Sequence, residues 1–184
     1  MAAPTASAVT SFIASSAASN DPASTVAAQV LHNLQHQHLW TDLKSHDAFT
    51  LSSTQHAPLI LGRPPQTVYT HPDEQAYMVQ YGIKVEDVPV ENEWVLPTAQ
   101  GQTWSLRRLA GIFDALPDRD AVAEASSEAL RSENPKLAEF YKKRREEGWN
   151  VKRLLLAMIN TGMGGDGTVV YYVVLEGAIK PRQN

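Results

Sequence analysis

Apolar residues recur with a helical period near the N-terminus and again in the middle of the chain. In "SNDPASTVAAQVLHNLQHQHLWTDL", Pro22 suits the first turn of a helix, and an apolar stripe runs from Val26 to about Trp40 and Leu43. In "HPDEQAYMVQYG", Pro72 begins a shorter helix of one or two turns. We therefore expect a long amphipathic helix first and a short helix later.

The clearest amphipathic pattern is "QTWSLRRLAGIFDALP", which ends at Pro117. Its apolar residues stand at positions i, i+3, i+4 and i+7: Leu106, Leu109, Ala110 and Phe113. Residues 118–148 are charged and rich in Ala and Glu. We expect two helices there, the second from Asn134 to just before Gly148, as a helical insertion on the domain surface.

Four short apolar runs predict strands. "APLILG" and "EWVLPT" lie mid-chain, and "NVKRLLLAMIN" and "TVVYYVVLEG" form a hairpin at the C-terminal end. The run Val169 to Leu175 is apolar on both alternating faces, which is typical of a strand covered on both sides. The order of elements predicts an α/β (α+β) fold in which helices flank a mixed sheet. We expect one domain over residues 21–184.

Composition narrows the classes of function. The chain has 184 residues, 43% of them hydrophobic, a net charge of −4 and no cysteine. The absence of cysteine excludes disulfides, thiol catalysis and cysteine-based zinc sites. The negative net charge excludes RNA binding that depends on the overall charge of the protein. Residues 1–20 are rich in Ala, Ser and Thr and are expected to be a disordered tail. With no basic residue before Lys44 and no long apolar run, we expect a soluble intracellular protein without membrane insertion.

Three glycines have the spacing of a dinucleotide-binding turn: Gly162, Gly164 and Gly167. That turn requires a helix after the glycines, whereas here a strand, "TVVYYVV", follows at once. The glycines therefore indicate a hairpin loop, and we expect no cofactor.

Three histidines on or near the first helix, His32, His36 and His38, have a spacing found among metal ligands. They lie nearly opposite the apolar stripe, and neither cysteines nor an acidic cluster accompany them. A solvated face explains them better, so we expect no metal site.

Basic residues gather near the end of the second predicted insertion helix and before the first C-terminal strand: Lys142, Lys143, Arg144, Arg145, Lys152 and Arg153. A solvated or helix-capping role is one interpretation. Contact with an RNA backbone is the other, and the residues leave both open.

Taken together, "EWVLPTAQGQTWSLRRLAGIFDAL", "KRLLLAMINTGMGGDGTVVYYVVLEG" and "IKPRQN" resemble the small accessory (SEN-fifteen) subunit of the eukaryotic tRNA-splicing endonuclease in its fungal form. The likeness covers residues 22–60 weakly and 93–184 well, apart from 118–148. It implies a tRNA-intron endonuclease-like fold and a heterotetramer of related subunits. It also implies a nuclear location, or one on the cytosolic face of the mitochondrial outer membrane as part of the complex.

In that family two subunits cleave precursor tRNA without metal, using a Tyr, a His and a Lys. Lys152 stands at the place of the lysine, but Tyr69 and His71 are only two residues apart, and Leu61, at the family spacing, cannot ionise. The resemblance therefore implies a non-catalytic subunit that pairs with the subunit cleaving the 3′ splice site. A self-sufficient endonuclease using Tyr69, His71 and Lys152, and a homodimeric scaffold unrelated to RNA, are the alternatives.

The resemblance also implies where partners meet, because the final strands of paired subunits form a continuous sheet in the family. The residues expected at this interface are Val169, Val170, Tyr171, Tyr172, Val173, Val174 and Leu175. Asp166, the one acid of the preceding loop, would dock into a basic pocket of the opposite dimer. An ordinary central strand of a monomer is the other interpretation of the apolar run.

Overall fold

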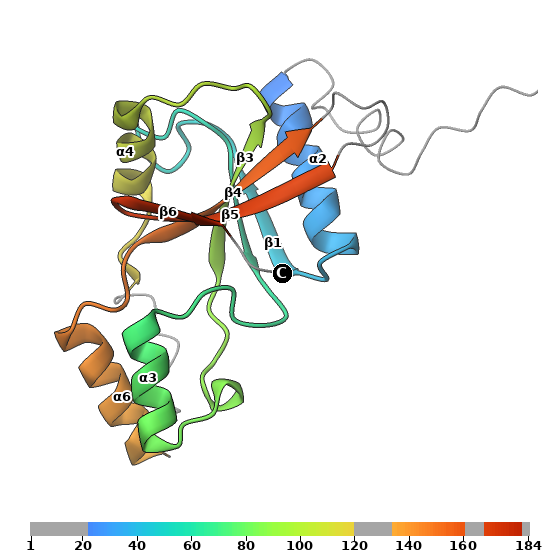
Figure 1. Cartoon of the computed structure of the whole chain (residues 1–184). Coiled ribbons are helices and arrows are strands. Elements are labelled where there is room, and N and C mark those ends of the chain that lie inside the picture. Colours follow the sequence, from blue (N-terminus) through green and yellow to red (C-terminus); the bar gives the residue numbers. More distant parts are fainter. Residues whose placement is uncertain (1–21, 120–133, 161–167, 182–184) are drawn as a thin grey trace, which may run out of the picture.

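A six-stranded mixed sheet forms the centre of the molecule (Figure 1). The computed structural model describes residues 22–119, 134–160 and 168–181. The strands lie in chain order across the sheet: β1 (Thr41–His46), β2 (Leu59–Arg63), β3 (Glu93–Ala99), β4 (Arg153–Asn160), β5 (Thr168–Leu175) and β6 (Ala178–Pro181). Strands β3 and β4 are parallel and all other neighbours are antiparallel. The predicted mixed sheet is therefore confirmed.

Helices cover both faces of this sheet. Helix α2 (Pro22–His36) packs Val30 and Leu34 on one face, and α4 (Leu106–Ala115) packs Ile112 and Phe113 on the other. Successive residues of a strand point to opposite faces. The central strand β4 accordingly sends Leu155, Ala157 and Ile159 toward α2, and Leu154 and Leu156 toward α4.

Helix α2 ends earlier than the apolar stripe predicts. It stops at His36, and Leu39 adopts a left-handed backbone (φ 55°), which no helix can continue. Trp40 and Leu43 keep the apolar character seen in the sequence, but they reach the α2-side core from a turn and from β1.

Two strands were not predicted. Strand β1 begins at Thr41 and has the burial pattern of an exposed edge strand. Because it buries little, its sequence shows no apolar alternation. Its pairing with β2 is irregular between Thr41 and Lys44. Strand β6 follows a turn at Gly177 (φ 88°) and pairs with β5, so that β5 has a neighbour on each side.

Helices α3 (Pro72–Tyr81) and α6 (Pro135–Glu146) lie side by side below the sheet (Figure 1). With the 3-10 helix η2 (Val85–Asp87), we call them the helical unit. Its small core is separate from those of the sheet: Met78, Ile83, Leu137, Phe140 and Tyr141. The predicted second helix of the charged segment is thus confirmed, and it has a well-buried face.

Several predictions lie outside the described residues. They concern the N-terminal tail, the glycine loop with Asp166, and residues 120–133 of the first insertion helix. None of the helices that are described has the length and apolar character needed to cross a membrane.

Candidate functional site

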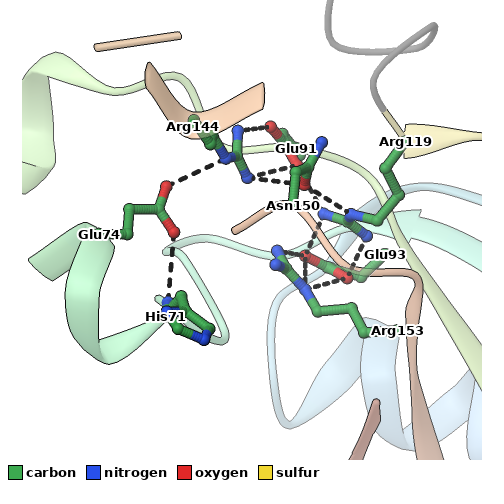
Figure 2. A network of polar contacts seen from close by, with 8 residues as sticks. All are labelled: His71, Glu74, Glu91, Glu93, Arg119, Arg144, Asn150 and Arg153. Carbon is green, nitrogen blue, oxygen red and sulfur yellow. Dashed lines mark hydrogen bonds and ion pairs between the residues drawn. The ribbon is translucent and has the colours of Figure 1, made fainter. Parts of the chain in front are cut away.

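Three arginines and three glutamates meet where the sheet joins the helical unit (Figure 2). Because β3 and β4 are parallel neighbours, they begin at the same end of the sheet, and their first residues, Glu93 and Arg153, lie side by side there. Helix α6 contributes Arg144 and α3 contributes Glu74. The charge cluster comprises Glu74, Glu91, Glu93, Arg119, Arg144 and Arg153, with Asn150 between them.

Glu93 is the centre of the half of the charge cluster nearest the sheet. Its carboxylate accepts hydrogen bonds from Arg153 Nε (3.1 Å) and from Arg119 Nη1 (3.1 Å). The side chains of Glu93, Arg153 and Arg119 are only 3%, 5% and 9% exposed. Two buried guanidinium groups therefore share one buried carboxylate.

Arg144 connects the charge cluster to the helical unit. Its Nη1 donates to Glu91 (2.6 Å), its Nη2 donates to Asn150 Oδ1 (3.0 Å), and its Nε lies 3.1 Å from Glu74 Oε1. Burial opposes ionisation of Glu91, but the positive charges of Arg144 and Arg119 outweigh it and lower the pKa of Glu91 to about 2. Glu91 is therefore ionised at neutral pH.

The six charges of the cluster balance, three positive against three negative. Each guanidinium already has a carboxylate within hydrogen-bond or ion-pair distance, so the cluster offers no uncompensated cation to a phosphate. What it does is fasten α3 and α6 to the start of β3 and β4. Buried ion pairs of this kind hold a particular geometry, because breaking one leaves an unpaired charge away from water.

The Tyr, His and Lys of the rival catalytic hypothesis have other partners around this region. His71 Nδ1 accepts from the backbone N–H of Asp73 (3.3 Å) and so caps α3. Lys152 Nζ donates to the carbonyl of Leu116 (3.2 Å). The guanidinium carbon of Arg153 lies 5.7 Å from the ring centroid of Tyr69. These contacts fit structural roles for all three residues.

The basic residues predicted from the sequence divide into two groups. Arg144 and Arg153 are buried in the charge cluster, and their burial argues against the RNA contact predicted for them. Lys142 and Lys143 form ion pairs with Glu146 (3.9 Å) and Glu147 (2.6 Å), each four residues further along the chain, at the end of α6 and at its C-cap. Arg145 is exposed and Lys152 half-buried. RNA contact by Lys142, Lys143, Arg145 and Lys152 stays a prediction.

The three histidines on or just after α2 make ring contacts. The rings of His32 and His36 lie 4.4 Å apart, and that of His38 packs edge-on against Tyr171 (5.1 Å). Among the described residues, no group of three or more His, Cys, Asp or Glu side chains is arranged to hold a metal ion.

Strand β5 divides the predicted interface residues between two faces. Val169, Tyr171, Val173 and Leu175 pack in the core on the α2 side, and Val174 packs in the core on the α4 side. Val170 is 43% exposed and Tyr172 half-buried, on the α4 face. Their register partners on β4 are the half-buried Met158 and Leu156. We call these four side chains, Leu156, Met158, Val170 and Tyr172, the open patch.

Comparison with known proteins agrees with the resemblance found in the sequence. The family model described as "Sen15 protein" matches residues 29–184. The chain belongs to the Sen15 family. The predicted family is thus confirmed, and the match extends over β1 and the helical unit, which the resemblance had covered weakly or not at all.

One Sen15-like relative of the chain comes from Neurospora crassa and is named "Probable tRNA-splicing endonuclease subunit tsp-1". It is 35% identical over 164 residues, which make up 84% of this chain and 64% of the relative. The chain therefore spans somewhat less than two thirds of the relative's length.

The charge cluster of this Sen15 family member was not predicted from its sequence. A signal is nevertheless present, because Glu93 and Arg153 each stand directly before an apolar strand, "WVL" and "LLL". Charged residues at the first positions of two adjacent buried strands need partners of opposite charge. The partners come from residues 26 to 60 positions away in the chain, so the sequence does not reveal which they are.

Proposed function

We propose that this Sen15 family chain is a non-catalytic structural subunit of the tRNA-splicing endonuclease and supports a catalytic partner during intron removal from precursor tRNA. Cleavage by attack of a 2′-hydroxyl requires a general base, a proton donor and a cation placed together. The main support is that Lys152, at the place of the family's catalytic lysine, is bound to the carbonyl of Leu116 while its neighbour Arg153 is neutralised by Glu93.

We further propose that the open patch is where the chain meets its partner, the subunit that cleaves the 3′ splice site. Both Val170 and Tyr172 pair with β4, and β6 adds a second neighbour to β5 from Tyr172 onward, so the apolar surface lies on a hydrogen-bonded sheet. Stable subunit interfaces are apolar at their centres, and aromatic residues such as Tyr are enriched there. The proposed location is the nucleus, or the cytosolic face of the mitochondrial outer membrane as part of the complex.

An activity assay tests the non-catalytic role. The purified chain is incubated with intron-containing precursor tRNA, alone and with the co-expressed catalytic subunits. The proposal expects cleavage only in the presence of the catalytic subunits. It also expects the assembled complex to keep its activity when this chain carries Lys152→Ala. Metal-independent cleavage by the chain alone, lost in His71→Ala, would support the self-sufficient endonuclease instead.

A homodimeric scaffold is the second alternative, since an apolar patch can also bind a second copy of the chain. Analytical ultracentrifugation of the chain with and without endonuclease subunits separates the two. The proposal expects any homodimer to give way to a heteromeric species on mixing. A homodimer that persists beside unbound endonuclease subunits would favour the scaffold.

A further inference from the structure

The segment between β1 and β2, residues 47–58, is built around one buried side chain. Gln55 is fully buried, and its Nε2 donates to the carbonyls of Asp47 (3.0 Å) and Ala57 (3.0 Å). Its Oε1 accepts from the backbone N–H of Leu51 (2.8 Å). A buried amide with both donors and its acceptor in use fixes the backbone around it. We call this segment the Gln55 loop.

The Gln55 loop holds an aromatic ring in solvent. Phe49 is 59% exposed although its backbone is left-handed (φ 65°), a conformation that bulky residues rarely adopt. The backbone N–H of Phe49 donates to the carbonyl of Gln55 (2.8 Å), which helps to keep it there. Strain of this kind persists only where the surrounding structure enforces it, and it gathers at functional sites. Phe49 therefore has the features of a contact residue for a ligand.

Three other side chains continue the surface from Phe49 to α4. The ring of His56 packs edge-on against Phe49, with 5.2 Å between centroids. The carbonyl of His56 accepts from Arg108 Nη2 (3.1 Å), and the Arg108 guanidinium lies over the Trp104 ring, 4.7 Å from its centroid. Trp104 is itself fixed, because its Nε1 donates to Thr98 Oγ1 (3.0 Å). Arg107, exposed on α4, adds a second positive charge.

We propose that this surface, the aromatic–arginine platform of Phe49, His56, Trp104, Arg107 and Arg108, binds unpaired bases of single-stranded RNA. Aromatic rings and guanidinium planes stack on base faces, and arginines also contact the backbone phosphates. The alternation of rings with positive groups fits a nucleic acid better than the apolar side chains of a protein partner, which would leave the guanidinium groups without charge partners. On α6, Lys142 and Lys143 are already paired with Glu146 and Glu147, whereas the cations of the platform are guanidinium groups, which can stack on bases as well as contact phosphates.

This inference rests on the proposed function for the identity of the RNA, but binding is measured on the chain alone. Fluorescence anisotropy follows titration of a labelled oligouridylate, with a blunt RNA duplex of equal length as the comparison. The platform predicts tighter binding of the single strand. Phe49→Gly should weaken that binding about 5- to 150-fold, the loss expected from one stacked base. Because glycine adopts positive φ freely, the same variant should keep or raise the melting temperature.

Two further variants locate the site. Phe49→Trp preserves a stacking face and should bind within about twofold of the unmodified chain. Arg107→Gln should reduce the slope of log affinity against log salt by about 0.7, the value for one phosphate contact with a single strand. The double variant Lys142→Gln with Lys143→Gln is the matched control on α6 and should leave the effect of Phe49→Gly unchanged.

Unchanged oligouridylate binding in a folded Phe49→Gly variant would overturn the platform, as would equal binding of duplex and single strand. A Phe49→Gly variant that binds RNA normally but loses the co-expressed endonuclease subunits would show a protein contact instead. Assembly is thus measured separately from RNA binding. Phe49-dependent RNA binding in a chain that does not assemble would support the platform and overturn the proposed function.

Discussion

Glu93→Gln tests whether the charge cluster holds the helical unit to the sheet. The change removes one negative charge and keeps the size of the side chain, so Arg119 loses one carboxylate partner and Arg153 loses the one that it contacts. Removing one partner of a buried pair costs about 3–5 kcal/mol, because the remaining charge is left uncompensated away from water. For a chain of this length, that corresponds to a melting temperature lower by about 6–20 °C.

Differential scanning calorimetry measures the shift, with Glu146→Gln as the control. Glu146 is an exposed partner of Lys142 at 3.9 Å, so its loss should change stability by no more than about 0.5 kcal/mol. Adding Arg153→Met to Glu93→Gln removes one of the stranded cations and should restore part of the lost stability. Equal melting temperatures for Glu93→Gln and Glu146→Gln would refute the reasoning, since the buried and the exposed pair would then contribute alike.

Lowering the pH and removing one hydroxyl group test two further contributions to the free energy of unfolding. The pKa of Glu91 is lowered from 4.5 to about 2, so the stability that its ionised form contributes, about 3 kcal/mol, is present above pH 4.5 and is lost as pH falls toward 2. Urea denaturation across this range should show that loss diminished in Glu91→Gln, and an equal loss in both proteins would contradict it. The Tyr171 hydroxyl donates to Asn33 Oδ1 (2.6 Å) between β5 and α2, so Tyr171→Phe should lower the free energy of unfolding by about 1 kcal/mol. An unchanged urea midpoint in Tyr171→Phe would show that this hydrogen bond contributes nothing.

The elements that could be predicted are those whose apolar residues repeat with a clear period. The run "TVVYYVVL" and the stripe from Leu106 to Phe113 predict β5 and α4, because apolar residues stand at the positions that the strand and the helix bury. Strand β1 could not be predicted, because an edge strand buries little and its sequence carries no alternation.

The candidate site was harder to predict than the fold. A basic run looks the same in sequence whether its members face water or carboxylates. Lys143 and Arg144 are adjacent, yet the first is at the surface of α6 and the second is 5% exposed. One cause is helical geometry, since consecutive residues of a helix point about 100° apart. The other is that folding brings glutamates of α3 and of the segment before β3 close to Arg144. The exposure of Phe49 likewise depends on a left-handed backbone that residue type does not predict.

The central claim, that the open patch joins this Sen15 family chain to a catalytic partner, is tested most directly by co-purification of the endonuclease subunits. Val170→Asp with Tyr172→Asp places two charges on a surface that is already partly exposed. The variant should therefore keep its circular dichroism spectrum while losing the partner. Val79→Asp, on the 77% exposed Val79 of α3, is the matched control and should retain it. Recovery of the catalytic subunit by the folded double variant at the level of the unmodified chain would contradict the account.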